Sequence, residues 1–204
     1  MKLTWLGHSC FCVEEDGYRL LLDPYADVDG YPPLHAEANE VLVSHDHFDH
    51  NHIEAITLLP RRKSPFTVRK VETFHDDQGG ALRGPNTIHI IQGDGLTVAH
   101  LGDLGHPLSP EQLSAVGKCD LLMVPVGGYF TIDAAGAAGV VDALGGGTVV
   151  PMHYRHPPYG FPKTAELDKF LQFYPLSQIW RLSDNSFTVE KAEGTRIVIP
   201  SFQN

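Results

Sequence analysis

The stretch that most constrains this chain is SHDHFDHNH at residues 44–52, which contains four of the twelve histidines and two aspartates. Packing does not explain it, because histidine has only an intermediate preference for burial and crowded imidazoles repel one another once protonated. Imidazole and carboxylate groups are, in contrast, ligands for zinc, iron and manganese. The stretch therefore predicts a metal centre, and the alternative is a polar loop that is merely rich in histidine.

The spacing within this stretch favours a loop over a helical zinc motif. A helical motif would place two histidines four residues apart with a glutamate beside the first, and that pattern is absent. His45, His47 and Asp49 alternate as in an extended chain, so a loop can direct His45 and His47 to one metal and Asp49 and His50 to another. We also expect Asp49 to cap a helix that contains residues 53–59.

Apolar and β-branched runs predict a chain rich in strands, with helices interspersed. Strands are expected at 3–6, 18–23, 40–44, 66–74, 86–91, 96–101, 119–126 and 147–152, and around FTVE and RIVI. Helices are expected at 52–60, 110–117, 131–144 and 164–174. A chain of 204 residues can bury a substantial core, so we predict a single α/β domain, residues 1–204, with a mixed sheet.

Ionisable residues lie directly after the ends of six predicted strands. These residues are His8, Asp23, His45, His75, Asp103 and His153. In α/β proteins, ligand sites gather beyond the carboxyl ends of the strands. We therefore expect the six side chains to converge on one site.

The composition indicates which classes of partner this chain can bind. The formal net charge of −10 disfavours long nucleic acids, which are bound largely through Lys and Arg. The first residues lack the pattern of a signal peptide, and no apolar run approaches the ~18 residues that span a bilayer. The cysteines are odd in number, and Cys10 and Cys12 lie two residues apart in a strand-like stretch, so we expect these two to pack on one face as small hydrophobes rather than to form a disulfide. We expect a cytoplasmic protein with a small-molecule substrate and no nucleic-acid or membrane partner; the sequence indicates no oligomeric state.

Further motifs along the chain resemble those of one family. They are WLGHSCF, LLLDPY, FHDDQGG, RGPNTI, HLGDLGH, VPVGGYFTID and VPMHYR. Together with SHDHFDH, and in this order, they resemble the metallo-β-lactamase-fold hydrolases, in the branch of small zinc-dependent hydrolases that includes ascorbate-phosphate-lactonase-like proteins. The resemblance covers nearly the whole chain. It implies an α/β fold, a four-layer αβ/βα sandwich of two mixed sheets flanked by helices, with the metal site at one edge.

The resemblance also implies a role for each motif residue. The implied ligands are three for a first metal ion (His45, His47 and His75), three for a second (Asp49, His50 and His153) and one bridge, Asp103. Asp23 would orient the histidine loop from outside the ligand set. The cofactors implied are two divalent metal ions, Zn²⁺ first, with Mn²⁺ or Fe as alternatives. We assign Asp49 and Asp103 as the catalytic residues.

Such a site predicts a metal-dependent hydrolase. Two divalent cations ~3.5–4 Å apart can share a water as hydroxide near neutral pH. This hydroxide would attack an ester, lactone, amide or phosphoester of a small substrate, with anionic substrates included. An iron-dependent oxidoreductase on the same fold is the alternative, but such relatives usually carry a flavodoxin-like partner domain and often a Glu where this chain has His47. A non-catalytic metal-binding protein would be expected to lack some ligands.

Four further residues are candidates for lining the pocket or supporting the ligands: His8, Arg83, His106 and Tyr154. His8 could donate a proton, and Arg83 could bind a carboxylate or phosphate through two hydrogen bonds. Each has a structural alternative, namely a hydrogen-bonded histidine, a salt bridge or packing in the core.

His100 lies only three residues before Asp103 and could be mistaken for a ligand. The run TVAHL has the alternation of a strand, in which neighbouring side chains point to opposite faces. We therefore predict that His100 points away from the metals and forms a structural hydrogen bond.

Overall fold

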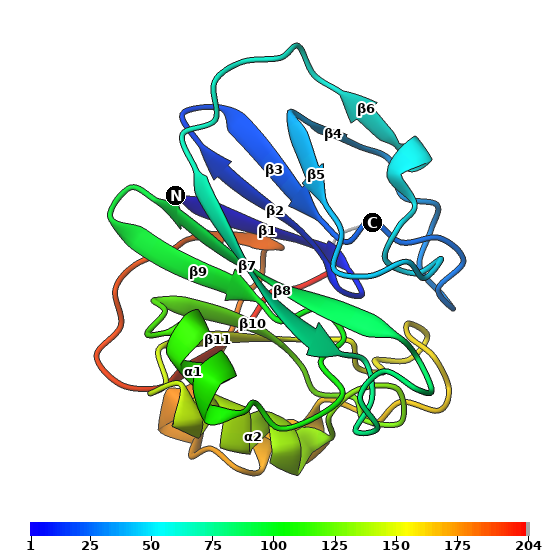
Figure 1. Cartoon of the computed structure of the whole chain (residues 1–204), viewed down its shortest axis with the longest axis vertical. Helices are drawn as coiled ribbons and strands as arrows, with labels where there is room; N and C mark the ends of the chain where they lie inside the picture. Colours follow the sequence, from blue (N-terminus) through cyan, green and yellow to red (C-terminus); the bar gives the residue numbers. More distant parts are fainter. Residues whose placement is uncertain (203–204) are drawn as a thin grey trace.

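The computed structural model describes residues 1–202, which form two stacked sheets (Figure 1). The first sheet contains, in spatial order, β13 (Ser186–Thr188), β1 (Lys2–Gly7), β2 (Cys10–Glu15), β3 (Tyr18–Leu22) and β5 (Glu40–Leu42). The second contains, in spatial order, β12 (Ile179–Arg181), β14 (Arg196–Ile199), β11 (Thr148–Met152), β10 (Leu121–Pro125), β9 (Leu96–His100), β8 (Pro85–Gly93) and β7 (Thr67–Phe74). Both sheets combine parallel and antiparallel pairs, which confirms the predicted mixed sheets.

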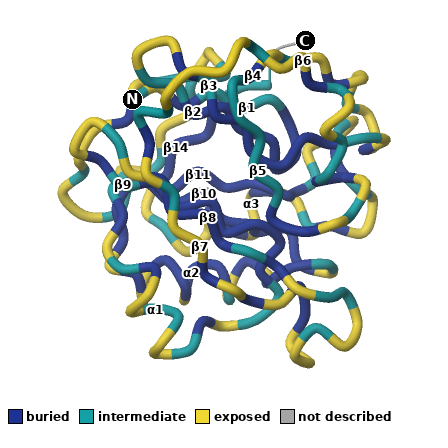
Figure 2. The backbone as a smooth tube through the Cα atoms, turned by 45° about the horizontal axis from the view of Figure 1, so that its top comes forward, coloured by how far each residue is buried: buried dark blue, intermediate teal, exposed yellow. Residues whose placement is uncertain are grey.

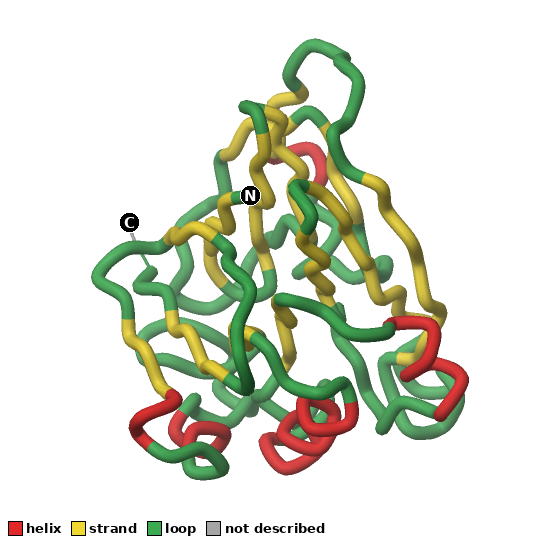
Figure 3. The backbone as a smooth tube through the Cα atoms, turned by 90° about the vertical axis from the view of Figure 1, so that its left-hand side faces the viewer, coloured by secondary structure: helices red, strands yellow, loops and turns green. Residues whose placement is uncertain are grey.

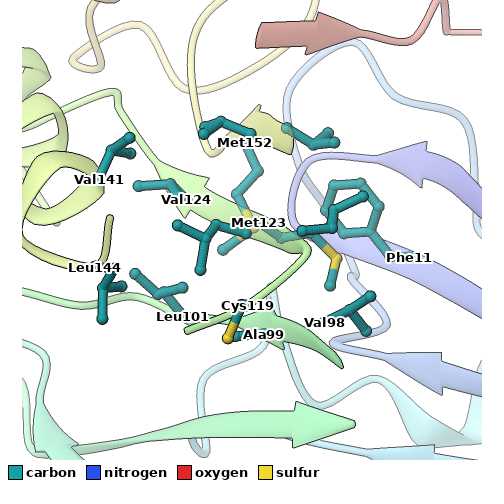
Figure 4. Close-up of a cluster of buried hydrophobic side chains, with 14 of the residues drawn as sticks. Phe11, Val98, Ala99, Leu101, Cys119, Met123, Val124, Val141, Leu144 and Met152 are labelled. Carbon is teal, nitrogen blue, oxygen red and sulfur yellow. The ribbon is translucent and has the colours of Figure 1, made fainter. Parts of the chain in front are cut away.

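The middle of the seven-stranded sheet is the core of the molecule. Every residue of β10 and β11 is buried, and both strands are nearly continuous apolar runs, as expected of strands covered on both faces. Figure 2 shows these strands dark blue along their length. In Figure 4, Met123 lies toward Phe11 of the other sheet, whereas Val124 lies toward Val141 on the opposite face. This doubly covered sheet gives rigid support to the loops at its edge.

Three α-helices within residues 1–202 are α1 (Pro110–Val116), α2 (Ala134–Ala143) and α3 (Asp168–Leu171), and two single turns are η1 (Ile53–Ala55) and η2 (Leu176–Gln178). Figure 3 shows the helical segments along one side of the molecule, apart from η1. A reciprocal capping box between Ser109 and Gln112 starts α1. The Asp133 carboxylate starts α2 by accepting from the Gly136 N–H at 2.8 Å. The predicted helices at 110–117 and 131–144 are confirmed as α1 and α2, and these caps determine where each helix begins.

The predicted helix at 52–60 is wrong. Its residues form only the turn η1, followed by β6 (Ile56–Leu58), which pairs in parallel with β4 (Ala36–Ala38). The β-branched residues Ile56 and Thr57 suit this ladder better than a helix. Asp49 is therefore no helix cap: the turn begins at His52, and no side chain caps it.

The predicted helix at 164–174 is wrong over most of its length, because only the four residues of α3 are helical. Ala165 instead makes extended-chain hydrogen bonds, accepting from the Arg155 N–H at 2.9 Å and donating to the Gly127 carbonyl at 2.7 Å. Local periodicity could not reveal these contacts with distant loops.

A second, smaller core lies between the five-stranded sheet and the β4–β6 pair. It contains Cys10, Leu21 and Ile56, among others. Cys10 and Cys12 are both buried and free, as predicted, and so is Cys119. None of the helices within residues 1–202 is long and apolar enough to cross a bilayer.

Candidate metal centre

Strand ends from both sheets deliver the candidate residues to one edge of the sandwich. His8 follows β1, Asp23 follows β3, His45 follows β5, His75 follows β7, Asp103 follows β9 and His153 follows β11. All six are buried. His8, Asp23 and His153 adopt left-handed φ angles of 48°, 47° and 54°, which non-glycine residues hold mainly where their surroundings enforce them. The structure thus brings together the residues that the strand ends predicted.

Within residues 1–202, three groups of donor atoms are close enough to hold a metal ion, and the third, which combines Asp23 with His45 and His50, shares one histidine with each of the other two. In the first group, atoms of His45, His47 and His75 lie within 4.8 Å of one another. In the second group, atoms of His8, Asp49, His50 and His153 do so. Imidazole and carboxylate sets of this kind suit zinc, iron or manganese. His8 is the member of these first two groups that the predicted ligand set did not include.

Asp103 lies between the first and the second group. Its Oδ2 is 3.2 Å from His75 Nε2 and 3.1 Å from His153 Nε2. Asn86 holds this loop in place, because its Oδ1 accepts from the Asp103 N–H at 2.9 Å. Gly102 allows the Asp103 loop to lie close to Asn86: its φ is +56°, and a Cβ at this position would collide with the Asn86 side chain.

Asp23 contacts the histidine loop rather than the middle of the centre. Its Oδ1 accepts from the Ser44 N–H at 2.7 Å, and its Oδ2 accepts from the Ser44 hydroxyl at 2.5 Å. Oδ2 also lies 2.8 Å from His50 Nδ1. An ionised carboxylate here accepts from Nδ1–H and leaves Nε2 with a free lone pair. Such a contact fixes the tautomer and orientation of a metal-binding histidine, which supports the predicted role of Asp23.

The charges of the protein itself favour a cation in this site. Burial would raise the pKa of Asp103, but His153 and His50 outweigh it and hold that pKa well below its usual range. Burial opposes protonation of His50, but Asp103 and Asp49 outweigh it and hold its pKa well above the usual range. Burial and the neighbouring His50 lower the pKa of His45 to about 3. Positive charge is thus favoured beside these carboxylates, and a metal ion, which needs a deprotonated imidazole, would compete with a proton for His50.

Buried donor atoms without partners mark the same place. Within residues 1–202, no hydrogen-bond partner is found for His45 Nε2, His50 Nε2, His75 Nδ1, Asp103 Oδ1, His153 Nε2 or either ring nitrogen of His8. A buried polar group left unpaired costs about 1–3 kcal/mol. A metal ion bound to these atoms would satisfy several of them at once, so the residues fit a metal centre.

A hollow of about 330 Å³ opens onto the centre. It is lined by five metal-capable residues (His47, Asp49, His75, Asp103 and His153) and by Phe48, Arg83, Phe130 and Phe161. Phe161 packs against His8 and His153 at ring-centroid distances of 5.5 and 6.3 Å, so the aromatic lining begins at the donor groups. The volume is near the lower end of the range for small-molecule sites.

The remaining predicted residues divide between this hollow and the scaffold. Arg83 lines the hollow. Tyr154 does not: its ring is buried in the core and stacks on Trp5 at 6.2 Å. His106 also lies outside the hollow, on an exposed loop, where its Nε2 accepts from the Phe74 N–H at 3.1 Å. It therefore contacts the backbone beside a candidate ligand rather than the site.

His100 makes the structural hydrogen bonds that strand alternation predicted. It is fully buried, its Nε2 lies 2.9 Å from the Ser9 carbonyl, and its Nδ1 accepts from the Gly102 N–H at 3.1 Å. Within the described part of the chain, it belongs to none of the donor groups.

Several supporting residues were missed by the sequence reasoning. Ser44 and Asn86 position Asp23 and Asp103, and the Asp76 carboxylate accepts from four backbone N–H groups of the loop that follows it. The only signal for Ser44 was its place beside His45. Asn86 could be suspected only from its place in the RGPNTI motif.

Comparison with known proteins shows what the chain resembles. Residues 2–153 match the family model described as Beta-lactamase superfamily domain. A UPF0173 protein of Pyrococcus furiosus is 31% identical over 208 aligned positions, which cover 89% of this chain and 94% of that protein. A UPF0173 metal-dependent hydrolase of Carboxydothermus hydrogenoformans is 29% identical over 193 positions, covering 76% and 83%. A crystal structure from Thermotoga maritima, named as a Zn-dependent hydrolase of the metallo-beta-lactamase superfamily, is 32% identical, with a TM-score of 0.79 over 99% of both chains.

Proposed function

Because the chain belongs to the metallo-β-lactamase superfamily of metal-dependent hydrolases, we propose that it hydrolyses a small molecule at a centre for two divalent metal ions. The position of Asp103 carries this proposal, since its Oδ2 lies 3.2 and 3.1 Å from one histidine of the first and one of the second donor group. A carboxylate between two groups of donors matches a pair of ions and exceeds what one tetrahedral ion needs.

In this proposal the seven predicted ligands keep their roles. One ion would be held by His45, His47 and His75, the other by Asp49, His50 and His153, and Asp103 would be shared between them. We propose Zn²⁺, with Mn²⁺ and Fe as metals that accept the same ligands. Ions bound there supply a nucleophilic water at neutral pH and polarise the substrate oxygen.

The residues of the chain balance the charge of the ions, place a group that can move a proton, and exclude bulk water. Asp49 and Asp103 stay ionised, because nearby histidines hold both pKa values below their usual range against the effect of burial, and their charge balances the cations. His8 Nε2 lies 3.3 Å from Asp49 Oδ2, so His8 is placed to move a proton beside the second group. Phe161 covers His8 and His153 and keeps bulk water away from them.

We also propose a small-molecule substrate and a cytoplasmic location. The volume of the hollow, about 330 Å³, supports a small ligand. Three free cysteines, all buried, support a reducing compartment.

Elemental analysis and a hydrolysis screen test the proposal together. Protein purified without chelator should contain close to two transition-metal ions per chain. Ester, lactone, amide and phosphodiester substrates should then be tested with metal-free protein and with protein reloaded with zinc, manganese or iron. Activity that survives complete removal of metal would refute metal dependence. Full activity with one ion, in a protein unable to take a second, would refute the two-ion centre.

A further inference from the structure

We propose that the substrate carries an anionic group that binds Arg83 and an apolar or aromatic body that lies against Phe48, Phe130 and Phe161. This inference rests on the proposed function, because it names the substrate class of that same site. In this inference Arg83 selects substrates that carry a negative charge, and the three phenylalanines select substrates with an apolar body.

Arg83 is a cation without a carboxylate partner in the described part of the chain. Within residues 1–202 its guanidinium forms no ion pair, and its hydrogen bond runs from Nη2 to the Tyr129 carbonyl at 3.1 Å. Its Cζ lies 5.9 Å from the centre of the Phe130 ring. Nη2 carries a second N–H, so one edge of the guanidinium, formed by Nη2 with either Nε or Nη1, remains available. A guanidinium with two free donors in a fixed plane suits a carboxylate or phosphate, whose oxygens accept two parallel bonds.

The loop on which Arg83 stands is held in place. The Asp76 carboxylate accepts the Arg83 N–H at 2.7 Å and three other N–H groups of the same loop. Tyr129, which supplies the acceptor carbonyl, has a left-handed φ of 59°. Lys163 Nζ donates to the Tyr129 hydroxyl at 2.9 Å, which secures the second loop. Strained backbone beside a hollow points to function, and a guanidinium fixed before binding loses less entropy when an anion arrives.

The hollow outside the donor groups is otherwise aromatic. Phe161 contacts Phe48 and Phe130 at ring-centroid distances of 6.3 and 5.8 Å, so the three rings form one continuous wall. Phe48 is 59% exposed although it lies in the middle of the histidine loop, so much of its apolar side chain stays in contact with water. An apolar group laid against this wall would be removed from water, which stabilises the complex.

The charge of the hollow depends on the metal. Asp49 and Asp103 line it and would repel an anion in the metal-free protein. Two divalent cations would outweigh these carboxylates, and Arg83 adds a further positive charge. Anion binding therefore has to be measured with the metal-loaded protein.

Calorimetric titration with three matched probes tests the inference. The probes are phenylsuccinate, its monoamide, and succinate, which lacks the ring. The metal-loaded wild type should bind phenylsuccinate about 10–100-fold more tightly than the monoamide, because one carboxylate reaches the metal centre and the other forms a charge-assisted pair with Arg83. It should bind succinate at least about 10-fold more weakly than phenylsuccinate, because succinate has no ring to bury against the three phenylalanines.

Two variants assign the effect to Arg83. Arg83→Gln should keep its metal and reduce the preference for the dianion to within about threefold, since the charged donor is lost. Arg69→Gln is the matched control: Arg69 Nη1 also donates to a backbone carbonyl, that of Ala115 at 2.8 Å, but Arg69 does not line the hollow, so the preference should persist.

Each outcome decides the inference. An unchanged preference in Arg83→Gln would overturn it and leave Arg83 as a support for the Tyr129 carbonyl. Equal binding of phenylsuccinate and succinate, or no binding of either, would overturn it as well. Because the readout is binding, it separates this inference from the proposed function. A protein that binds metal and dianion but hydrolyses nothing would refute the hydrolase alone, and hydrolysis without dianion preference would refute the inference alone.

Discussion

Asparagine in place of Asp23 changes the chemistry of one atom in a buried side chain, and we expect it to weaken metal binding. Oδ1 of the asparagine can still accept from the Ser44 N–H, as the aspartate does at 2.7 Å. Its Nδ2 then faces His50 Nδ1, which lies 2.8 Å from Oδ2 in the native protein. Two N–H donors cannot face each other. The imidazole can relieve the clash by moving its proton to Nε2, and this removes the lone pair that would bind the metal.

The magnitude follows from the contact that is lost. A hydrogen bond to a charged group contributes about 1.5–3 kcal/mol, which corresponds to roughly a 10–100-fold loss of metal affinity. The same range is typical of changes in residues that orient metal ligands. Competition with a chelating indicator measures the affinity, and elemental analysis measures the metal content. The imidazole tautomer can be read from the nitrogen chemical shifts of the His50 ring.

Asp120→Asn is the matched control for this experiment. Asp120 Oδ2 accepts from the Thr97 N–H at 2.8 Å, away from the donor groups, so the same loss of charge should leave metal affinity unchanged. A folded Asp23→Asn protein with wild-type affinity for both ions would refute the tautomer argument.

Three further outcomes are expected. Asp103→Ala should lose metal affinity by at least about 10–100-fold, together with activity; a variant with both ions and near-normal turnover would show that the bridge is wrongly assigned. His75→Ala should lose metal, whereas His100→Gln should retain it. His100→Gln should instead lower the free energy of unfolding by about 1–3 kcal/mol, because the buried backbone groups that pair with the ring lose a partner. The opposite pattern in metal analysis would reverse the assignment. Burial would raise the pKa of Asp76, but hydrogen bonds from four backbone N–H groups outweigh it and lower this pKa to about 2. The stability that the carboxylate contributes is therefore complete above about pH 4 and is lost as the pH falls through about 2. Denaturation curves of Asp76→Asn should lack this acid dependence.

The metal-capable residues could be predicted from the sequence because their types have no other reason to gather. Histidines crowded into residues 44–52 do not serve packing, and the ends of apolar runs showed which further histidines and aspartates would join them. The buried strands were also readable, since β10 and β11 are apolar throughout. For these features local chemistry and the final fold agree.

The errors fall where partners distant in the chain override local pattern. Residues 52–60 have the periodicity of a helix, but Ile56 pairs with Ala36 in a ladder that no local rule reveals. Asn86 reaches Asp103 only because β8 lies beside β9 in one particular register. Tyr154 follows a candidate ligand directly, yet its ring lies in the core and stacks on Trp5, a residue far away in the sequence.

The donor groups also connect the two sheets, which gives the metals a structural consequence. His45, after β5, comes from the five-stranded sheet, and its partner His75, after β7, comes from the seven-stranded sheet. The second group does the same with His8, after β1, and His153, after β11. Each ion would therefore join both layers at the edge of the sandwich. A metal that binds only the folded protein raises its stability by an amount that grows with the logarithm of its concentration over its dissociation constant. A ligand substitution thus lowers thermal stability even where it leaves packing intact, so the unfolding of such variants has to be compared in the metal-free state before any loss is attributed to the core.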